Sequence, residues 1–307
     1  MAVVTHVPTR RLLLVHAHPD DESIGTGAMM AKYVAEGASV TLITCTLGEE
    51  GEVLVPDLAQ LATDQADQLG GWRITELTNA MAELGVTDHR YLGGAGRFRD
   101  SGMMGHPSNA KPRAFWRADQ DPAVFDAAVL ALVEVIRQVR PHVVVTYDDF
   151  GGYGHPDHIM AHRVTTAAVE AAAQDDYSSD AGQAWDVAKL YWTAMPRSVM
   201  AEGLAALKTV PNSPFAEISS VDELDMVVDD DLVTTAIDGN DYVQAKLRAM
   251  AAHVTQITTD GPFFALSNHL GQRAWGTEYL RLAKGQAGGP RDRDGRETDL
   301  FGGVELA

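Results

Sequence analysis

Apolar residues in the first 175 positions fall into short compact runs that alternate with longer amphipathic stretches. The short runs are rich in Val, Leu and Ile, which is typical of parallel strands buried on both faces. They predict strands at residues 11–17, 39–46, 89–92 and 142–147. The longer stretches have helical spacing and predict helices at residues 24–36, 58–84 (interrupted or kinked at Gly70-Gly71), 122–139 and 157–173.

Strands that alternate with helices indicate an α/β fold with a doubly wound, mostly parallel sheet of the Rossmann-like type. We expect residues 1–175 to form this domain. A polar, acidic stretch at 175–186 separates it from a less regular region with a strand at 232–237 and a helix at 242–253. Residues 176–307 are therefore expected to form a smaller C-terminal α/β region that packs on the first and helps to shape its pocket. Its Gly-rich segment at 285–296 is expected to be flexible.

The composition is that of an ordinary globular protein, with 45% hydrophobic and 22% charged residues. A net charge of −19 argues against binding to nucleic acid or to an anionic membrane surface, because both require clustered Lys and Arg. No apolar run approaches the roughly 18 residues of a membrane span. The apolar run after Arg11 is too short for the core of a signal peptide. We expect a cytoplasmic protein, and no obligate protein partner is evident.

Two clusters of imidazole and carboxylate groups follow predicted strands. His18-Pro-Asp-Asp-Glu22 comes directly after the first strand, and His155-Pro-Asp-His158 follows the strand at 142–147. Ligands of open parallel sheets bind beyond the carboxyl ends of the strands, so both clusters are expected at one rim. A catalytic zinc ion takes three His or carboxylate ligands and keeps a position for water. The clusters offer more groups than that, which leaves some for proton transfer.

The remaining histidines and the single cysteine have plainer interpretations. Cys45 lies in a predicted strand and is expected to be a small buried residue. One thiol can form neither an internal disulfide nor a Cys-based zinc cage. His16 is expected to pack in the core or to support the site from behind, and His162 leaves an i,i+4 metal pair with His158 open. Six further histidines are expected to be structural or solvated: His6, His89, His106, His142, His253 and His269.

The Gly-rich stretches raise a competing interpretation, a dinucleotide site. Neither residues 93–96 nor residues 25–27 complete G-x-G-x-x-G in a strand–turn–helix context, so the signal is weak. The H-E-x-x-H pattern of zinc peptidases is absent as well. The two His and Asp clusters therefore remain the main indication of chemistry.

The two clusters resemble those of the PIG-L/LmbE-like family of zinc-dependent N-acetylglucosaminyl deacetylases. Five further segments are similar to the actinobacterial members of mycothiol biosynthesis: Thr46–Val53, Asp67–Arg73, Tyr91–Met103, Thr146–His158 and Glu297–Leu300. The likeness is dense over residues 10–170 and thinner beyond. It implies hydrolysis of the N-acetyl amide of 1-(2-acetamido-2-deoxy-glucopyranosyl)-myo-inositol to acetate and the free amine. The expected partner is thus a small sugar-inositol substrate.

The resemblance also implies the metal ligands and the base. It makes His18, Asp21 and His158 the ligands of one Zn²⁺ ion per chain, although Fe²⁺ or Co²⁺ suits similar ligands. It makes Asp20 the general base that activates water. The division of the general-acid role between Asp20 and His155 stays open.

Further roles follow from the same resemblance. His155, oriented by Asp157, would stabilise the charge of the tetrahedral intermediate or protonate the leaving amine, and Tyr153 would assist at the oxyanion. The substrate-binding residues implied by the family pattern are Glu52, Arg73, Asp100 and Met103.

Three alternatives remain at this point. A related amidase that cleaves mycothiol S-conjugates shares the fold and the ligands, and a deacetylase of another N-acyl glucosaminide would use the same chemistry. A non-catalytic sugar-binding or metal-regulated protein would need the metal and the pocket. It would not need the base Asp20 or the pair of His155 and Asp157, which are both present.

Overall fold

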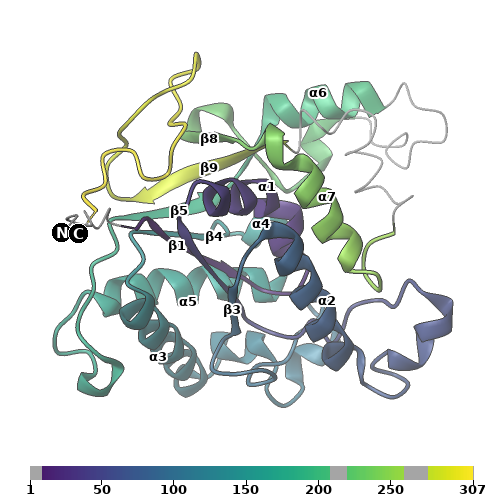
Figure 1. The fold of residues 1–307 in the computed structure, drawn as a ribbon. Helices are drawn as coiled ribbons and strands as arrows, with labels where there is room; N and C mark the ends of the chain where they lie inside the picture. The colour runs from purple at the N-terminus through teal and green to yellow at the C-terminus, as the bar shows by residue number, and fades with distance from the viewer. Residues whose placement is uncertain (1–8, 208–219, 259–275, 307) are drawn as a thin grey trace, which may run out of the picture.

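One seven-stranded sheet organises the chain (Figure 1). The computed structural model describes residues 9–207, 220–258 and 276–306. The sheet has the order β3-β2-β1-β4-β5-β9-β8, in which β1 to β5 run parallel and β9 is antiparallel to both of its neighbours. Its strands are β1 (Arg11–His16), β2 (Ser39–Thr44), β3 (Asp88–Tyr91), β4 (Val143–Thr146), β5 (Lys189–Thr193), β8 (Thr235–Asp238) and β9 (Thr277–Lys284). The expected mostly parallel, doubly wound sheet is confirmed.

Helices cover both faces of this sheet (Figure 1). One face carries α1 (Asp21–Ala35), α2 (Leu69–Leu84) and α7 (Val243–Ala252). The other face carries α3 (Pro122–Val139) and α5 (Pro156–Ala172). Smaller elements include α4 (Gly151–Gly154), α6 (Arg197–Leu207), the paired strands β6 (Met195–Pro196) and β7 (Val227–Val228), and several short 3₁₀ helices.

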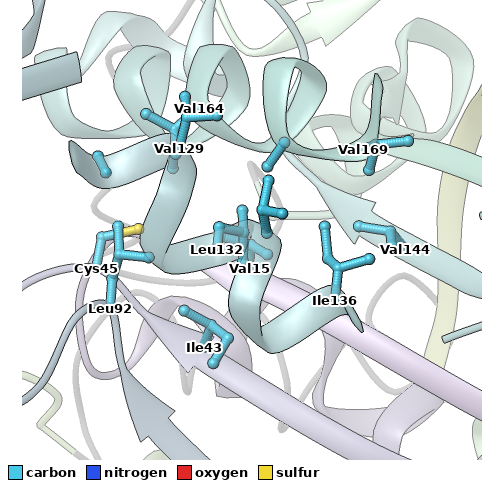
Figure 2. Packing of buried hydrophobic residues seen from close by; sticks show 14 of the residues in the cluster. Val15, Ile43, Cys45, Leu92, Val129, Leu132, Ile136, Val144, Val164 and Val169 are labelled. Atoms are coloured by element: carbon cyan, nitrogen blue, oxygen red, sulfur yellow. The ribbon is translucent and has the colours of Figure 1, made fainter. Parts of the chain in front are cut away.

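Alternation along the strands produces two cores, because successive side chains point to opposite faces. Leu12 and Leu14 of β1 pack toward α1, α2 and α7, whereas Leu13 and Val15 pack toward α3 and α5. Figure 2 shows Val15 among side chains of the second core, including Leu132 of α3. Each fully buried side chain of this size contributes about 1.5–3 kcal/mol. The strand ends that carry the site are thus fixed from both sides.

Local signals explain which helices the sequence predicts well. The prediction of residues 122–139 is confirmed, since Asp121 caps α3 by accepting a hydrogen bond from the Ala123 amide at 3.0 Å. The prediction of one kinked helix over 58–84 is wrong. Its first part is a short 3₁₀ turn, Pro56–Leu61, and α2 begins only at Leu69. Gly70 lies in the first turn of α2, where an added Cβ would meet Glu49 Cγ at 2.7 Å, so this glycine serves a close approach.

The C-terminal region continues the same sheet, because β5 pairs with β4 and then with β9. The tail after β9 is attached through Glu297, whose carboxylate lies 2.7 Å from Lys189 Nζ and accepts the Tyr191 hydroxyl at 3.0 Å. The expected flexibility of residues 285–296 stays a prediction. Among the described residues, no helix combines the length and apolar character needed to cross a membrane.

Candidate metal centre

The two sequence clusters meet where the strand order reverses. Strands β1 and β4 are neighbours in the sheet, and the chain winds outward from them in opposite directions. The turn after β1 carries His18, while His155 caps α5 and His158 lies in its first turn, shortly after β4. The ring centre of His18 lies 4.6 Å from the ring centre of His155 and 5.3 Å from that of His158. This is the position at which open α/β sheets bind ligands.

Among the described residues, two groups of side chains lie close enough to hold a metal ion: His18, His155 and His158, and His18, Asp100 and Asp157. Asp21, the third expected ligand, belongs to neither group but lies beside both expected histidines. Asp21 Oδ2 lies 3.3 Å from His18 Nδ1 and 3.3 Å from His158 Nε2. His158 Nδ1 lies 3.1 Å from the carbonyl oxygen of Gly151, which can only accept, so Nδ1 carries the proton and Nε2 is free to coordinate. That buried Nε2 has no hydrogen-bond partner among the described residues. A buried lone pair without a donor fits a metal ion.

The electrostatics of the cluster also favour a cation. Burial opposes a charge on the His18 imidazole, yet Asp100, Asp157 and Asp21 raise its pKa well above the usual value. Burial likewise opposes the charge on Asp21, but the imidazoles of His158 and His18 lower the pKa of that carboxyl well below its usual value. Negative charge is thus concentrated around the His18 imidazole, and such a surrounding favours a cation at this place.

Tyr147 and His16 support these groups from behind. The Tyr147 hydroxyl donates to Asp21 Oδ2 at 2.8 Å and accepts the Ala17 amide at 3.0 Å. Its ring is stacked on His158, with centres 4.2 Å apart and planes 22° apart. His16 is buried with Nδ1 3.2 Å from the Tyr147 hydroxyl, which confirms its expected place behind the site. The role of Tyr147 was not predicted, since a tyrosine directly after a strand gives no sequence signal.

Asp20 lies beside the metal cluster and is held by Arg73. Arg73 Nη2 donates to Asp20 Oδ2 at 3.1 Å, and the same guanidinium donates to the carbonyl oxygens of Pro19 and Gly48. Burial raises the pKa of Asp20 to about 6; the Arg73 charge opposes this, and Asp21 adds to it. A carboxylate with a pKa close to the working pH suits general base catalysis.

His155, at the same site, is a neutral imidazole that can donate one hydrogen bond. Its Nδ1 accepts the Asp157 amide at 3.1 Å, which leaves the proton of the neutral ring on Nε2. Burial, followed by the neighbouring imidazoles of His18 and His158, lowers the pKa of His155 to about 3. The Asp157 carboxylate points elsewhere, toward His18 Nε2 at 3.2 Å and the Ser101 amide at 2.8 Å. The backbone of Asp157 therefore orients His155, while its carboxylate orients His18.

These groups line a cavity of about 230 Å³. Eight of the twelve lining residues were predicted for the site from the sequence. The other four, Glu50, Gly51, Gly102 and Gln256, were not assigned a role. The lining residues are His18, Asp20, Asp21, Glu50, Gly51, Arg73, Asp100, Gly102, Met103, Tyr153, His155 and Gln256. Asp157 and His158 are buried beneath this lining.

Three residues need separate placement. Glu52 is exposed and lines an adjoining hollow that shares Gly51 with the cavity. Gln256 follows α7, and its side-chain amide donates to the Glu52 carbonyl oxygen at 3.0 Å. This contact was not predicted from the sequence. His162 Nδ1 lies 3.0 Å from the Tyr147 carbonyl oxygen and belongs to neither of the groups that could hold a metal among the described residues, so the i,i+4 pair is not supported.

Solved structures share this architecture at low sequence identity. The N,N'-diacetylchitobiose deacetylase from Pyrococcus horikoshii is 16% identical with a TM-score of 0.60, over 89% of this chain and 83% of that one. A deacetylase of teicoplanin biosynthesis is 19% identical with a TM-score of 0.54, over 89% and 97% of the two chains. At these identities the likeness concerns the fold.

Relatives of much higher identity extend over the whole chain. A protein from Geodermatophilus obscurus named 1D-myo-inositol 2-acetamido-2-deoxy-alpha-D-glucopyranoside deacetylase is 61% identical, over 97% of this chain and 99% of its own. A protein of the same name from Acidothermus cellulolyticus is 58% identical, over 97% and 96%. The family model PIG-L, described as GlcNAc-PI de-N-acetylase, matches residues 13–169. The chain belongs to the PIG-L family of de-N-acetylases.

Proposed function

We propose that this chain is a metal-dependent hydrolase that removes acetate from 1-(2-acetamido-2-deoxy-glucopyranosyl)-myo-inositol, a step of mycothiol biosynthesis. Its full-length relatives bear the name of this deacetylase. The observation that carries the proposal is the grouping of His18, Asp21 and His158 beside two further groups, Asp20 and His155, suited to proton transfer and charge stabilisation.

The proposed ligands of the metal are His18, Asp21 and His158. A metal ion at this place supplies a Lewis acid and lowers the pKa of a bound water. The His, His and Asp donors suit Zn²⁺, which we propose, and they also suit Fe²⁺. Tyr147 and the Gly151 carbonyl fix the orientation of two of the ligands, as partners of metal-binding residues commonly do.

Asp20 is the proposed base. Its carboxylate accepts a proton from the water that attacks the amide carbonyl, and Arg73 holds it in place for that transfer. Its pKa of about 6 allows the same group to return the proton to the leaving amine once the C–N bond breaks. This division leaves His155 to a different task.

His155 is the proposed donor to the oxyanion. In its neutral form the ring keeps one proton, on Nε2, because Nδ1 accepts the Asp157 amide. A donor aimed at the developing negative charge of the tetrahedral intermediate lowers the barrier most when it is already oriented. Tyr153, at the exposed rim with its ring 6.2 Å from that of His155, is proposed to assist.

Substrate contacts are proposed for the cavity wall. Arg73 and Asp100 present polar groups to sugar hydroxyls, and exposed Met103 offers an apolar surface to a sugar face. Glu52, which lines the adjoining hollow, is proposed to bind hydroxyls of the sugar or the inositol. We also propose that residues 1–175 form the catalytic unit and that residues 176–307 complete its pocket, as the position of Gln256 supports.

The test is release of acetate and free amine from the sugar-inositol substrate by the purified protein. Activity should vanish on chelation and return with Zn²⁺ or Fe²⁺, and the more effective ion identifies the metal. Parallel assays with a mycothiol S-conjugate separate the amidase. Hydrolysis of the conjugate alone, or turnover that ignores the chelator, would contradict the proposal.

A further inference from the structure

A fully buried ion pair lies directly behind Asp20 and takes no part in the steps above. Glu22 Oε1 lies 2.9 Å from His253 Nε2, and both side chains are completely inaccessible to solvent. The Ser23 hydroxyl donates to the same oxygen at 2.6 Å. Burying a charged pair is costly unless its geometry is well satisfied. This pair joins α1 to the end of α7 across 231 residues of sequence.

The second carboxylate oxygen of Glu22 holds the backbone of Asp20. Glu22 Oε2 accepts the Asp20 amide at 2.9 Å. Asp20 has φ 102° and ψ −34°, a conformation that residues with a Cβ rarely adopt and that costs about 1–3 kcal/mol. Such strain persists only where the surroundings fix it. Arg73 fixes the Asp20 carboxylate and the preceding carbonyl, whereas Glu22 fixes the amide.

We propose that Glu22 and His253 are positioning residues for the base Asp20. Glu22 keeps the Asp20 backbone in its left-handed conformation, and His253 keeps Glu22 in place. Without the pair, the turn relaxes to an ordinary conformation and carries the carboxylate away from the position it holds beside the metal cluster. The inference rests on the proposed function, since only in that reaction is Asp20 the base.

The chain offers a matched control on the same helix. Lys246 of α7 forms a second buried pair, with Glu278 of β9, at 2.7 Å. Glu278 also accepts the amides of Ala28 and Met29 in α1, at 3.0 and 2.7 Å. This pair therefore also attaches α7 to α1, but through the amides of Ala28 and Met29, eight and nine residues beyond Asp20. Loss of Lys246 tests whether loosening α7 is sufficient to impair the reaction.

Kinetics separate positioning from general stability. Glu22→Ala and His253→Leu should lower kcat about 10–100-fold with KM within about twofold of wild type, a loss typical of groups that orient a site. Metal content should stay at the wild-type stoichiometry. Glu22→Gln keeps an oxygen for the Asp20 amide, and His253→Gln keeps a donor for Glu22, so both should recover most of kcat. Lys246→Met should lower the melting temperature and leave kcat unchanged.

Hydrogen exchange gives a readout that does not depend on the reaction. In the metal-free protein, the Asp20 amide should exchange at least about tenfold faster in Glu22→Ala than in wild type, and at the wild-type rate in Lys246→Met. An unchanged Asp20 amide, wild-type kcat in Glu22→Ala, or an equal loss of kcat in Lys246→Met would overturn the inference. Inactivity of the wild-type enzyme with metal would instead refute the proposed function, while the exchange rates would still decide the positioning role.

Discussion

The Tyr147 hydroxyl donates a hydrogen bond to Asp21 Oδ2 at 2.8 Å. Tyr147 directly follows β4, which is the sheet neighbour of β1, the strand that leads to Asp21. This contact orients the only carboxylate among the proposed metal ligands. Tyr147→Phe keeps the ring that stacks on His158 and removes the hydrogen bond. We expect metal affinity to fall about 10–100-fold, measured by competition with a chelator. Tyr33→Phe, which removes a buried hydroxyl bound to Asp299, is the control and should keep wild-type affinity.

Asp20 is predicted to be needed for turnover and not for metal binding. Asp20→Asn retains the size of the side chain and an oxygen that faces Arg73, but it cannot accept a proton at neutral pH. The expected loss in kcat is about 10²–10⁴-fold, the range for removal of a general base. Metal analysis of the same sample is the check, because a variant that also loses its metal would make Asp20 a ligand.

The anchor of the C-terminal tail is predicted to matter for stability alone. Glu297→Ala leaves Lys189 buried without its counter-ion, which typically costs about 3–5 kcal/mol. Urea denaturation should show this loss, and the double variant Lys189→Met/Glu297→Leu should regain part of it. Lys189 begins β5, at the end of the sheet away from the metal cluster. The kcat of the folded Glu297→Ala protein should therefore equal that of wild type, and a lowered kcat would contradict this assignment.

His142 is predicted to make stability depend on pH. Burial and the nearby Arg11 charge lower its pKa from 6.5 to about 4 in the folded protein. On acidification the unfolded chain takes up this proton first, so the free energy of unfolding decreases as pH falls from about 6.5 to about 4. The slope from one proton is at most about 1.4 kcal/mol per pH unit. His142→Gln should show a shallower decrease over this range, whereas identical slopes would exclude the effect.

Much of the N-terminal fold follows from local signals. The parallel strands are apolar because helices cover both faces, and α3 has a proline at its start and another shortly after its end. The start of α2 was not predictable from such local signals. Gly70, in the first turn of α2, leaves room for Glu49 of another loop, and the sequence alone does not show that these two residues meet. Strand β9 was missed for a similar reason: its place between β5 and β8 depends on pairing with distant segments.

The meeting of the two His and Asp clusters could be predicted because they follow strands whose carboxyl ends meet in any parallel sheet. The residues that orient the side chains of these clusters could not be predicted from the sequence. Tyr147 reaches Asp21 through the sheet pairing of β1 with β4, and His253 reaches Glu22 only once α7 has packed on α1. His253 was expected to be structural or solvated, and it is structural and fully buried.

The place of β9 in the sheet also sets an order for synthesis of the protein. Strand β9 lies between β5 and β8, although it follows both of them along the chain. In the described residues, the outer edge of β5 pairs with β9, while β8 pairs with β9 and, through Thr235, with Glu297, which also follows β9 along the chain. Until residues 277–284 have been synthesised, the described part of the chain leaves this edge of β5 without a partner strand, and an open strand edge is a template for pairing with another chain. All three proposed metal ligands have been made by then, so in the order of synthesis the proposed metal site precedes the strand that completes the sheet.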